Sequence, residues 1–311
     1  MTQPLPIADL AELVAPLRAT EFADLLAARV PHHLPGAGGD GGRYAALLDW
    51  DGLIGGVRDH KFPARDLSLL RDGVKVPPMF LRSGASPRSE VVDKLLAANA
   101  SIILSRAEQY VPALGRLCSA IAGSTRDHVS ATAVATAGGG GALPLHYDHY
   151  DIVVLQVDGA KQWSIYADPV TNPVYGMAPQ PPGDTTAPPA IEVVLTPGDW
   201  LFVPAGWRHC CDTKSARSLH LGILLYPLTA TRTVELILRE MLSTPGDRAP
   251  LRFDEIEAAT TEAALRRTII ERVNAMPIDE IVRIHQSSGG RPARPGRQAD
   301  DPAGDAGGDT S

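Results

Sequence analysis

Hydrophobic side chains recur at helical spacing in the first part of the chain. Residues 8–29 carry apolar positions at steps of three and four, which is typical of amphipathic helices: Leu10, Leu13, Val14, Leu17, Phe22, Leu25 and Leu26. The stretch 31–42 interrupts this pattern, and strand-like and helical pieces then follow in 74–81, 89–110 and 112–123. We therefore expect residues 1–126 to form a largely helical N-terminal part that contains a few strands.

Between residues 127 and 227 the pattern changes to short apolar runs separated by Gly, Pro and Asp. The runs of strand length are 128–136, 151–157, 160–166, 191–195, 200–204 and 218–226. Such a series predicts a β-sandwich or a small barrel. Asp158-Gly159 is the signal of a two-residue hairpin, and Pro197-Gly198-Asp199 marks another tight turn. The Pro-rich stretch 168–189 predicts a long loop over the barrel mouth.

After residue 227 the helical period returns. The stretches 231–242, 254–276 and 277–285 predict a C-terminal helical segment, residues 228–285, which would pack on the barrel or on a second copy of itself. Residues 286–311 contain no apolar side chain larger than proline. Because such a segment cannot bury a core, we expect a disordered tail there.

Composition narrows the class of protein. The chain has 311 residues, of which 44% are hydrophobic and 21% charged, as in an ordinary soluble globular protein. A net charge of −7 gives no electrostatic case for nucleic-acid binding. The first residues lack the pattern of a signal peptide, no apolar stretch is long enough to span a bilayer, and the three cysteines suggest no disulfide framework. We therefore expect a cytoplasmic protein without a membrane or nucleic-acid partner.

A short polar motif directly precedes the apolar run 151–157. It contains His146 and Asp148, which would share one face of a strand because residues two apart point to the same side. An imidazole and a carboxylate side by side suit a first-row divalent metal. Since a His-x-Asp pattern alone is more often a surface hydrogen-bonding pair, a metal site requires a further ligand elsewhere in the chain.

The further candidate is His209, at the end of 197-PGDWLFVPAGWRHC-210. It would come from a later strand of the same sheet system, although a single histidine there would more often be a core residue that bonds to backbone groups. Together, His146, Asp148 and His209 form a set of two histidines and one carboxylate, which leaves open positions on Fe(II). Structural zinc would use four protein ligands, and the cysteines offer no Cys-x-x-Cys pair.

Lys161 adds a positive charge to this region. If Asp158-Gly159 is a two-residue turn, Lys161 pairs with Gln156 and shares its face of the sheet. A lysine that faces a barrel interior is costly unless it meets an anion. On a straight strand Asp148 and Gln156 would lie about 26 Å apart at roughly 3.3 Å per residue. The chain must therefore curl or break near residues 149–151 for Lys161 to share a ligand with the metal.

These motifs resemble a known family. The string His146-Tyr147-Asp148, the apolar strand 152–157, the run 159-GAKQW-163, the Pro-Gly-Asp turn and His209 are similar to the JmjC (Jumonji-C) ribosomal-oxygenase type of cupin. The resemblance spans about residues 20–285 and is most specific between 143 and 222. It implies an α+β fold in which a double-stranded β-helix (jelly-roll, cupin) barrel has N-terminal helices and a C-terminal helical segment that supports dimerisation.

The resemblance also implies the cofactors. Family members use Fe(II), 2-oxoglutarate and O2. By this resemblance, His146, Asp148 and His209 would be the iron ligands, and Lys161 would pair with the distal carboxylate of 2-oxoglutarate. Thr132 stands nearest to an asparagine that many ribosomal oxygenases carry before the motif, so it is a candidate for a further co-substrate contact. The family's winged-helix module has no predicted counterpart in residues 286–311.

Other polar residues have open roles. His220 would either point inward near the co-substrate or pack as a satisfied core histidine. We predict His149 and Asp151 at the rim of the site, and Arg208 is a candidate contact to an acidic substrate. Trp163 is expected to be a packing residue.

The sequence thus predicts an Fe(II)- and 2-oxoglutarate-dependent oxygenase that hydroxylates an amino-acid side chain in a protein, a peptide or a small amino-acid-derived substrate. The Pro-rich loop 168–189 and the lack of a predicted winged helix favour the smaller substrates, and a tRNA base is also compatible with the barrel. Two alternatives stay open: a metal-binding cupin without oxygenase activity, acting as a sensor or isomerase, and a dimeric scaffold with a degraded site. Consumption of 2-oxoglutarate distinguishes the oxygenase from both.

Overall fold

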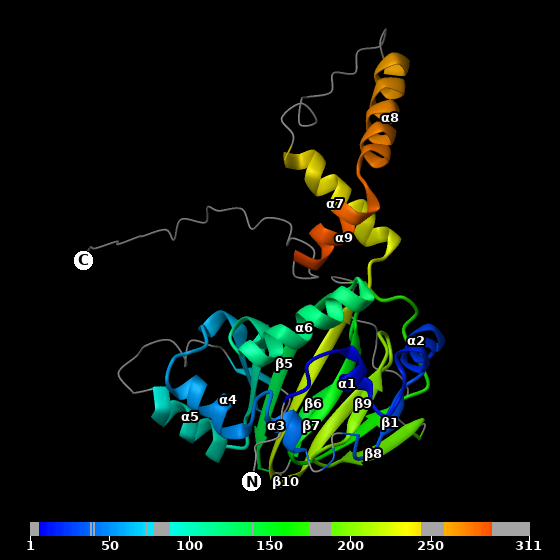
Figure 1. The fold of residues 1–311 in the computed structure, drawn as a ribbon. Coiled ribbons are helices and arrows are strands. Elements are labelled where there is room, and N and C mark those ends of the chain that lie inside the picture. The colour runs from blue at the N-terminus through cyan, green and yellow to red at the C-terminus, as the bar shows by residue number, and fades with distance from the viewer. Residues whose placement is uncertain are drawn as a thin grey trace, which may run out of the picture.

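A curled antiparallel sheet with helices on its outside forms the body of the molecule (Figure 1). The computed structural model describes residues 6–37, 39, 41–71, 74–76, 88–138, 140–174, 188–243 and 258–287. Its elements in chain order are α1 (Leu10–Val14), α2 (Ala19–Ala28), β1 (His32–Leu34), α3 (Gly42–Ala45), α4 (Trp50–Arg58), the 3₁₀ helix η1 (Ala64–Asp66), β2 (Leu67–Arg71), β3 (Val74–Val76), α5 (Arg88–Ala97), β4 (Ser101–Ser105), the 3₁₀ helix η3 (Ala107–Gln109), α6 (Pro112–Thr125), β5 (His128–Ala137), β6 (Gly140–His146), β7 (Asp151–Ile165), β8 (Ile191–Leu195), β9 (Trp200–Val203), β10 (His209–Tyr226), α7 (Ala230–Ser243), α8 (Ala258–Ala275) and α9 (Ile278–Ser287).

Two long strands build the barrel. The strand order is β1-β9-β7-β10-β5-β4-β2-β3, with β6 paired to β10 and β8 paired to β7. The first half of β7 pairs with β9, its second half pairs with β8, and β10 runs antiparallel along both halves. Each long strand therefore passes from one layer of the sheet to the other, as in a jelly roll. This arrangement confirms the predicted barrel fold, and strands β1 to β4, which precede residue 127, belong to the same sheet.

Alternate side chains of these strands enter two separate cores. On β7, Val153 and Leu155 join the core between the sheet and the N-terminal helices, which includes Phe22 of α2. Their neighbours Ile152 and Val154 face the barrel interior. Because both faces of the strand are covered, its sequence is apolar without interruption. The N-terminal helices predicted in 8–29 and 112–123 are α1, α2 and α6, and the Arg43–Glu12 ion pair at 3.2 Å links α3 to α1.

The predicted hairpin at Asp158-Gly159 is wrong. Residues on both sides of this pair belong to the single strand β7, which stays paired with β10. The ladder shifts register between Leu219 and His220 and between Thr213 and Ser218, and Gly159 has a φ of 64°. The sequence signal of a turn thus marks a bulged segment, residues 157–159, in which an extra residue is accommodated without reversing the chain.

The bulged segment changes the side on which later residues lie. In a straight strand, Gln156 and Lys161 would face opposite sides because they are five positions apart. After the bulge, Lys161 lies on the inner side together with Gln156, as the sequence analysis predicted for a different reason. The side chain of Gln156 supports the bulge, because its Nε2 donates to the carbonyl of Asp158 at 2.8 Å and to Ser218 Oγ at 2.9 Å.

Two further elements differ from the prediction. Helix α4 was not expected, and it contains Gly52, Gly55 and Gly56, which weaken the helical signal. Strand β6 ends at His146, so Asp148 lies in the connection to β7 and not on a strand. The break required near residues 149–151 is therefore present, since β7 starts only at Asp151.

The predicted C-terminal helices correspond to α7, α8 and α9, which extend from one end of the barrel (Figure 1). The end of α9 is joined to the barrel: His285 Nε2 donates to the carbonyl of Tyr226, and His128 Nδ1 donates to the carbonyl of Gln286, both at 2.8 Å. Residues 175–187 of the predicted Pro-rich loop and residues 288–311 of the predicted tail lie outside the described residues.

Candidate active site

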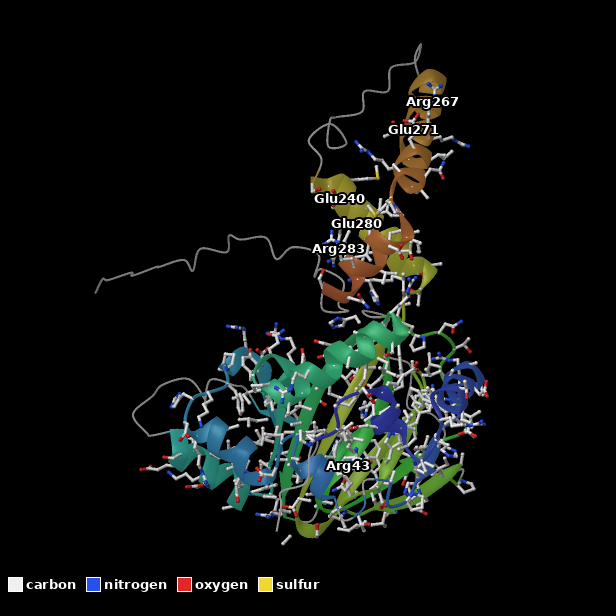
Figure 2. All side chains as sticks on the ribbon, in the orientation of Figure 1. Arg43, Glu240, Arg267, Glu271, Glu280 and Arg283 are labelled. Atoms are coloured by element: carbon white, nitrogen blue, oxygen red, sulfur yellow. The ribbon has the colours of Figure 1, made fainter. Side chains whose placement is uncertain are left out.

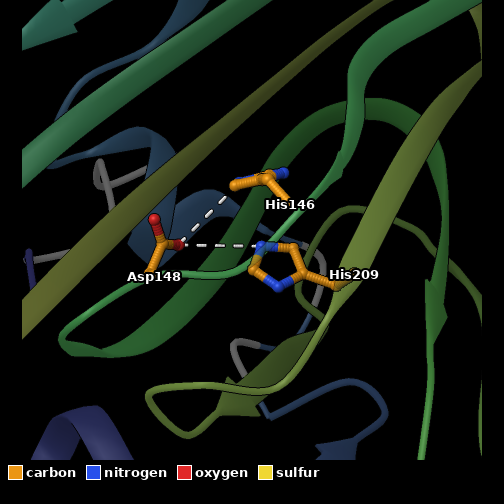
Figure 3. Close-up of side chains that lie close together, drawn as sticks. All are labelled: His146, Asp148 and His209. Carbon is orange, nitrogen blue, oxygen red and sulfur yellow. Dashed lines mark ion pairs between the residues drawn. The ribbon is translucent and has the colours of Figure 1, made fainter. Parts of the chain in front are cut away.

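His146, Asp148 and His209 meet at one point (Figure 3). One ligand atom from each lies within 4.8 Å of the others, and these three form a possible metal-binding group among the described residues. Asp148 Oδ2 is 3.9 Å from His146 Nε2 and 3.7 Å from His209 Nε2. His146 and His209 are directly paired on β6 and β10, so the sheet register brings the two imidazoles together.

Backbone carbonyls orient both rings. His146 Nδ1 donates to the carbonyl of Pro144, and His209 Nδ1 donates to the carbonyl of Trp207, each at 2.8 Å. In each ring the proton therefore resides on Nδ1, and Nε2 presents its lone pair towards Asp148. Metal-binding histidines are commonly fixed in this way, because a hydrogen bond to the second nitrogen sets the tautomer.

The surroundings of His209 keep it neutral. Burial, followed by the nearby His146, lowers the pKa of His209 to about 4, while Asp148 acts in the opposite direction. Trp163 stacks on the His209 ring with a centroid distance of 5.6 Å and an interplanar angle of 27°. Trp163 is a packing residue, as predicted, and it shields one face of a candidate ligand. A neutral imidazole at physiological pH is the form that binds a metal.

The triad opens into a cavity of about 700 Å³. The cavity wall includes Thr132, Trp163 and His220 as well as Glu108 and Tyr150. Strands β4, β5, β6, β7 and β10 together supply most of this wall. The space is large enough for a small co-substrate together with a substrate side chain.

Lys161 lies behind this wall and is fully buried. Its Nζ is 3.3 Å from Thr136 Oγ1 and 3.3 Å from Nδ1 of His220. Burial lowers the pKa of Lys161. Burial, followed by the nearby charge of Lys161, lowers the pKa of His220. Thr213, the direct cross-strand neighbour of Lys161, has a buried Oγ1 without a hydrogen-bond partner among the described residues.

The remaining predicted residues divide into two groups. Thr132, His220 and His149 line the cavity, although His149 does not belong to the triad. Asp151 is buried away from the rim, where its Oδ1 accepts from the amide of Ala205 at 2.7 Å. Arg208 binds the backbone carbonyl and the carboxylate of Asp168.

Sequence reasoning missed Thr136. This residue lies on β5 four positions after Thr132, so it shares the same side of the strand, and its hydroxyl also bonds with Ser101 Oγ at 2.9 Å. The spacing of four positions between Thr132 and Thr136 indicated that both face the same side of the strand. The contact of Thr136 with Lys161 depends on how β5, β10 and β7 pair, which the sequence does not show.

Comparison with known families identifies the segment that carries the site. Residues 104–232 match the family model described as the JmjC domain. This segment resembles a JmjC domain. It contains the complete triad, Lys161, Thr132 and His220. The resemblance found in the motifs is thus confirmed for the part of the chain that forms most of the cavity.

Relatives that match this segment are named as a ribosomal oxygenase and as a demethylase and histidyl-hydroxylase. The chain is 37% identical to ribosomal oxygenase 2 of Rattus norvegicus over 93 residues. The matched segment covers 29% of this chain and 20% of the relative. It is 30% identical over 148 residues to the bifunctional lysine-specific demethylase and histidyl-hydroxylase NO66 of Drosophila persimilis, which covers 41% of this chain and 20% of the relative. The matches therefore span about a fifth of the length of these relatives.

Solved structures share the fold of the whole body. The Escherichia coli ribosomal oxygenase YcfD superimposes with a TM-score of 0.57 at 16% identity, covering 86% of this chain and 68% of that one. A YcfD structure in complex with cobalt and 2-oxoglutarate gives a TM-score of 0.54 at 15% identity, with 81% and 66% covered. These likenesses confirm the predicted α+β fold with a double-stranded β-helix. In the described part of the chain, no helix has both the length and the apolar character needed to cross a membrane.

Proposed function

We propose that this chain is an Fe(II)- and 2-oxoglutarate-dependent oxygenase that hydroxylates an amino-acid side chain of a protein or peptide. The observation that carries the proposal is the convergence of His146, Asp148 and His209 on one cavity, with Lys161 buried behind the cavity wall. The names of the relatives, ribosomal oxygenase 2 and histidyl-hydroxylase NO66, support a protein substrate.

The donor set fits Fe(II). Two imidazole nitrogens and one carboxylate oxygen occupy neighbouring positions, and the cavity gives access for further, non-protein ligands. Such a set of two histidines and one carboxylate is typical of non-haem Fe(II) oxygenases. Among the described residues, the group of possible ligands contains no cysteine.

The surroundings of Lys161 fit a carboxylate of the co-substrate. A buried ammonium group without a counter-charge is costly, and an anion would offset that cost. Thr136 Oγ1 lies 3.3 Å from Lys161 Nζ, and Thr213, the cross-strand neighbour of Lys161, has a buried Oγ1 with no hydrogen-bond partner among the described residues. One cation and hydroxyl groups in a water-poor pocket match the needs of a carboxylate. We therefore assign Lys161 to the distal carboxylate of 2-oxoglutarate, with Thr132 and His220 on the wall beside it.

The protein's own residues provide binding and orientation. When bound, Fe(II) and 2-oxoglutarate supply the activation of O2, the oxidation of a substrate C–H bond and the release of succinate and CO2. His146 and His209 hold fixed tautomers through their carbonyl partners, so no reorganisation of the rings is required on metal binding. Trp163, Ile152 and Leu224 present apolar surface to the cavity, which limits the water around the reacting groups.

The first test is succinate formation from 2-oxoglutarate by the anaerobically iron-loaded protein after exposure to O2. Loss of a residue that merely orients a metal ligand costs about 10- to 100-fold, so Asp148→Ala is expected to lower the rate at least about 100-fold. Asp212→Ala is a matched control, because Asp212 is exposed on β10. Histidine- and arginine-containing peptides are added to detect coupled hydroxylation by mass spectrometry.

The outcome decides between the open alternatives. Succinate from the wild type and from Asp212→Ala, but not from Asp148→Ala, supports the oxygenase. A wild type that binds iron and consumes no 2-oxoglutarate with any peptide would be a metal-binding cupin of another kind. A wild type that binds no iron leaves only a scaffold role.

We further propose that the C-terminal helices mediate self-association in the cytoplasm. On α7, Val234, Leu238 and Leu242 repeat at steps of four and are 55%, 51% and 67% exposed. Figure 2 shows charged side chains along the same helical segment, among them Glu240 on α7, Arg267 and Glu271 on α8 and the Glu280–Arg283 pair on α9. An apolar stripe bordered by charges is typical of a surface that pairs with a second helix.

A further inference from the structure

The chain turns sharply between β9 and β10, over residues 204–207, just before His209. The amide of Gly206 donates to the backbone carbonyl of Asp148 at 2.8 Å. The carbonyl of Trp207 accepts from His209 Nδ1 at 2.8 Å. The turn therefore supports two members of the triad, one through its backbone and the other through its ring.

Arg29 holds this turn from the end of helix α2. Its guanidinium donates to the carbonyl of Ala205 at 3.2 Å, and its own carbonyl accepts from Trp207 Nε1 at 2.9 Å. The guanidinium also lies 3.5 Å from Oδ1 of Asp151, which itself accepts from the amide of Ala205. Arg29 thus contacts the turn at Ala205 and at Trp207. It also faces the buried carboxylate of Asp151, which bonds to the amide of Ala205 in the same turn.

The backbone of Arg29 is in the left-handed region, with φ 51° and ψ 45°, at the C-cap of α2. Its amide donates to the carbonyl of Leu25 at 3.0 Å, which closes the helix end. Glycine is the usual residue at such a cap, because a side chain there carries strain. A strained non-glycine residue points to a role for its side chain. Here this conformation accompanies the contacts of Arg29 with Trp207 and Ala205.

We infer that Arg29 is a positioning residue for the metal centre. By fixing the turn 204–207, it sets where His209 and Asp148 stand relative to each other, although it lies outside the JmjC-domain segment and contacts none of the triad side chains. The inference rests on the proposed metal site. It means that metal affinity depends on helix α2 as well as on the segment that matches the family model.

The test is the dissociation constant for Co(II), a spectroscopic stand-in for Fe(II), in the full chain. Arg29→Gly removes the guanidinium and keeps a residue suited to the left-handed cap, so the helix end is retained. We expect Co(II) affinity to fall about 10-fold, with a changed visible Co(II) spectrum and a nearly unchanged melting temperature of the metal-free protein. Arg29→Lys keeps the charge without the planar fork and should restore part of the affinity.

Arg18→Gly is the matched control. Arg18 flanks the other end of α2, its side chain is 77% exposed, and it pairs only with Glu21 among the described residues. Trp207→Phe tests the same contact from the turn, because it removes the indole donor to the carbonyl of Arg29 and leaves the guanidinium in place. We expect it to weaken Co(II) binding less than Arg29→Gly does.

Each outcome has one meaning. Unchanged Co(II) affinity and spectrum in Arg29→Gly and Trp207→Phe, with a wild type that binds Co(II), overturn the role of Arg29 and leave the proposed site intact. Weakened binding in Arg18→Gly as well shows a general effect of altering α2 and also overturns it. A wild type that takes up no Co(II) overturns the proposed metal site and this inference together.

Discussion

The buried charge of Lys161 is expected to lower the stability of the ligand-free protein and to strengthen the binding of 2-oxoglutarate. In the ligand-free protein its buried Nζ is within hydrogen-bond distance of Thr136 Oγ1 and His220 Nδ1, and among the described residues it forms no ion pair. Methionine has a similar length and no charge. We therefore expect Lys161→Met to raise the free energy of unfolding of the ligand-free protein by about 1–4 kcal/mol. The same change should weaken 2-oxoglutarate binding about 30-fold or more, since it removes one partner of a buried charge pair.

Thermal unfolding and calorimetric titration with 2-oxoglutarate measure the two effects of Lys161→Met separately. Lys214→Met serves as the control, because Lys214 is exposed on the neighbouring strand β10 and its loss should change neither quantity. A Lys161→Met protein that is less stable than the wild type, or that binds 2-oxoglutarate equally well, would contradict the assignment of the lysine.

Residue types and the family resemblance together predicted that three side chains meet at the site. His146, Asp148 and His209 come together as predicted, because a two-histidine, one-carboxylate set has few structural uses. Asp151 shows the limit of this reasoning. It repeats the motif in His149-Tyr150-Asp151, yet its carboxylate accepts from the amide of Ala205 and does not join His146 and His209. The different positions of Asp148 and Asp151 result from the path of the chain after His146.

At the level of elements, the turn between β9 and β10 depends on Gly206. Its φ is 88°, and a Cβ added there would lie 2.0 Å from the carbonyl oxygen of Val170. We expect Gly206→Ala to lower the free energy of unfolding by about 2 kcal/mol or more, because both the conformation and the close approach forbid a side chain. It should also weaken metal binding, since the amide of Gly206 bonds to the carbonyl of Asp148.

Denaturant unfolding and Co(II) titration check this prediction. In Gly123→Ala, the control, the added methyl group of helix α6 has no heavy atom within 4 Å. That substitution should leave metal binding unchanged and stabilise the protein by up to about 1 kcal/mol. Wild-type stability in Gly206→Ala would show that the turn adapts, and would weaken the case that its geometry controls the triad.

Strands and helices with a strong period were predicted, and those with mixed signals were not. The apolar runs became β5, β7, β8, β9 and β10, whereas the glycines of α4 concealed a helix that buries Leu53, Ile54 and Val57. Asp158-Gly159 is compatible with a hairpin or with a bulge on local grounds. Pairing with β10 on both sides decided for the bulge, and this long-range pairing is not visible in a local pattern.

For the whole molecule, the oligomeric state is the open prediction. If the exposed stripe of α7 pairs with a second copy, Leu238→Glu should convert a dimer into a monomer by placing a charge in an apolar interface. Light scattering over a range of protein concentrations measures the mass. Val194→Glu is the control, because Val194 is an exposed apolar residue on β8, far from the C-terminal helices in Figure 1. A monomeric wild type at every concentration would refute dimerisation.

The bounds 1–126, 127–227 and 228–285 stay a prediction, and strands β1 to β4 join the sheet of the barrel. The N-terminal helices, the barrel strands and the C-terminal helices were predictable from changes in hydrophobic period. The contacts that join these parts were not, because they link polar groups far apart in the sequence. His285 bonds to the carbonyl of Tyr226, Gln286 Nε2 donates to the carbonyl of Ala122, and Arg29 reaches Ala205. Each such contact uses a backbone carbonyl, whose availability depends on the completed fold.

The bulged segment 157–159 bears on how the lysine is recognised in related chains. The extra residue places Lys161 five positions after Gln156 and still on the inner side of β7. A chain with one residue fewer and a straight strand would present its lysine at the same place, four positions on. Counting residues from the first histidine would then assign different lysines to equivalent roles. The equivalent lysine is the one that faces inward, whatever its number in the sequence.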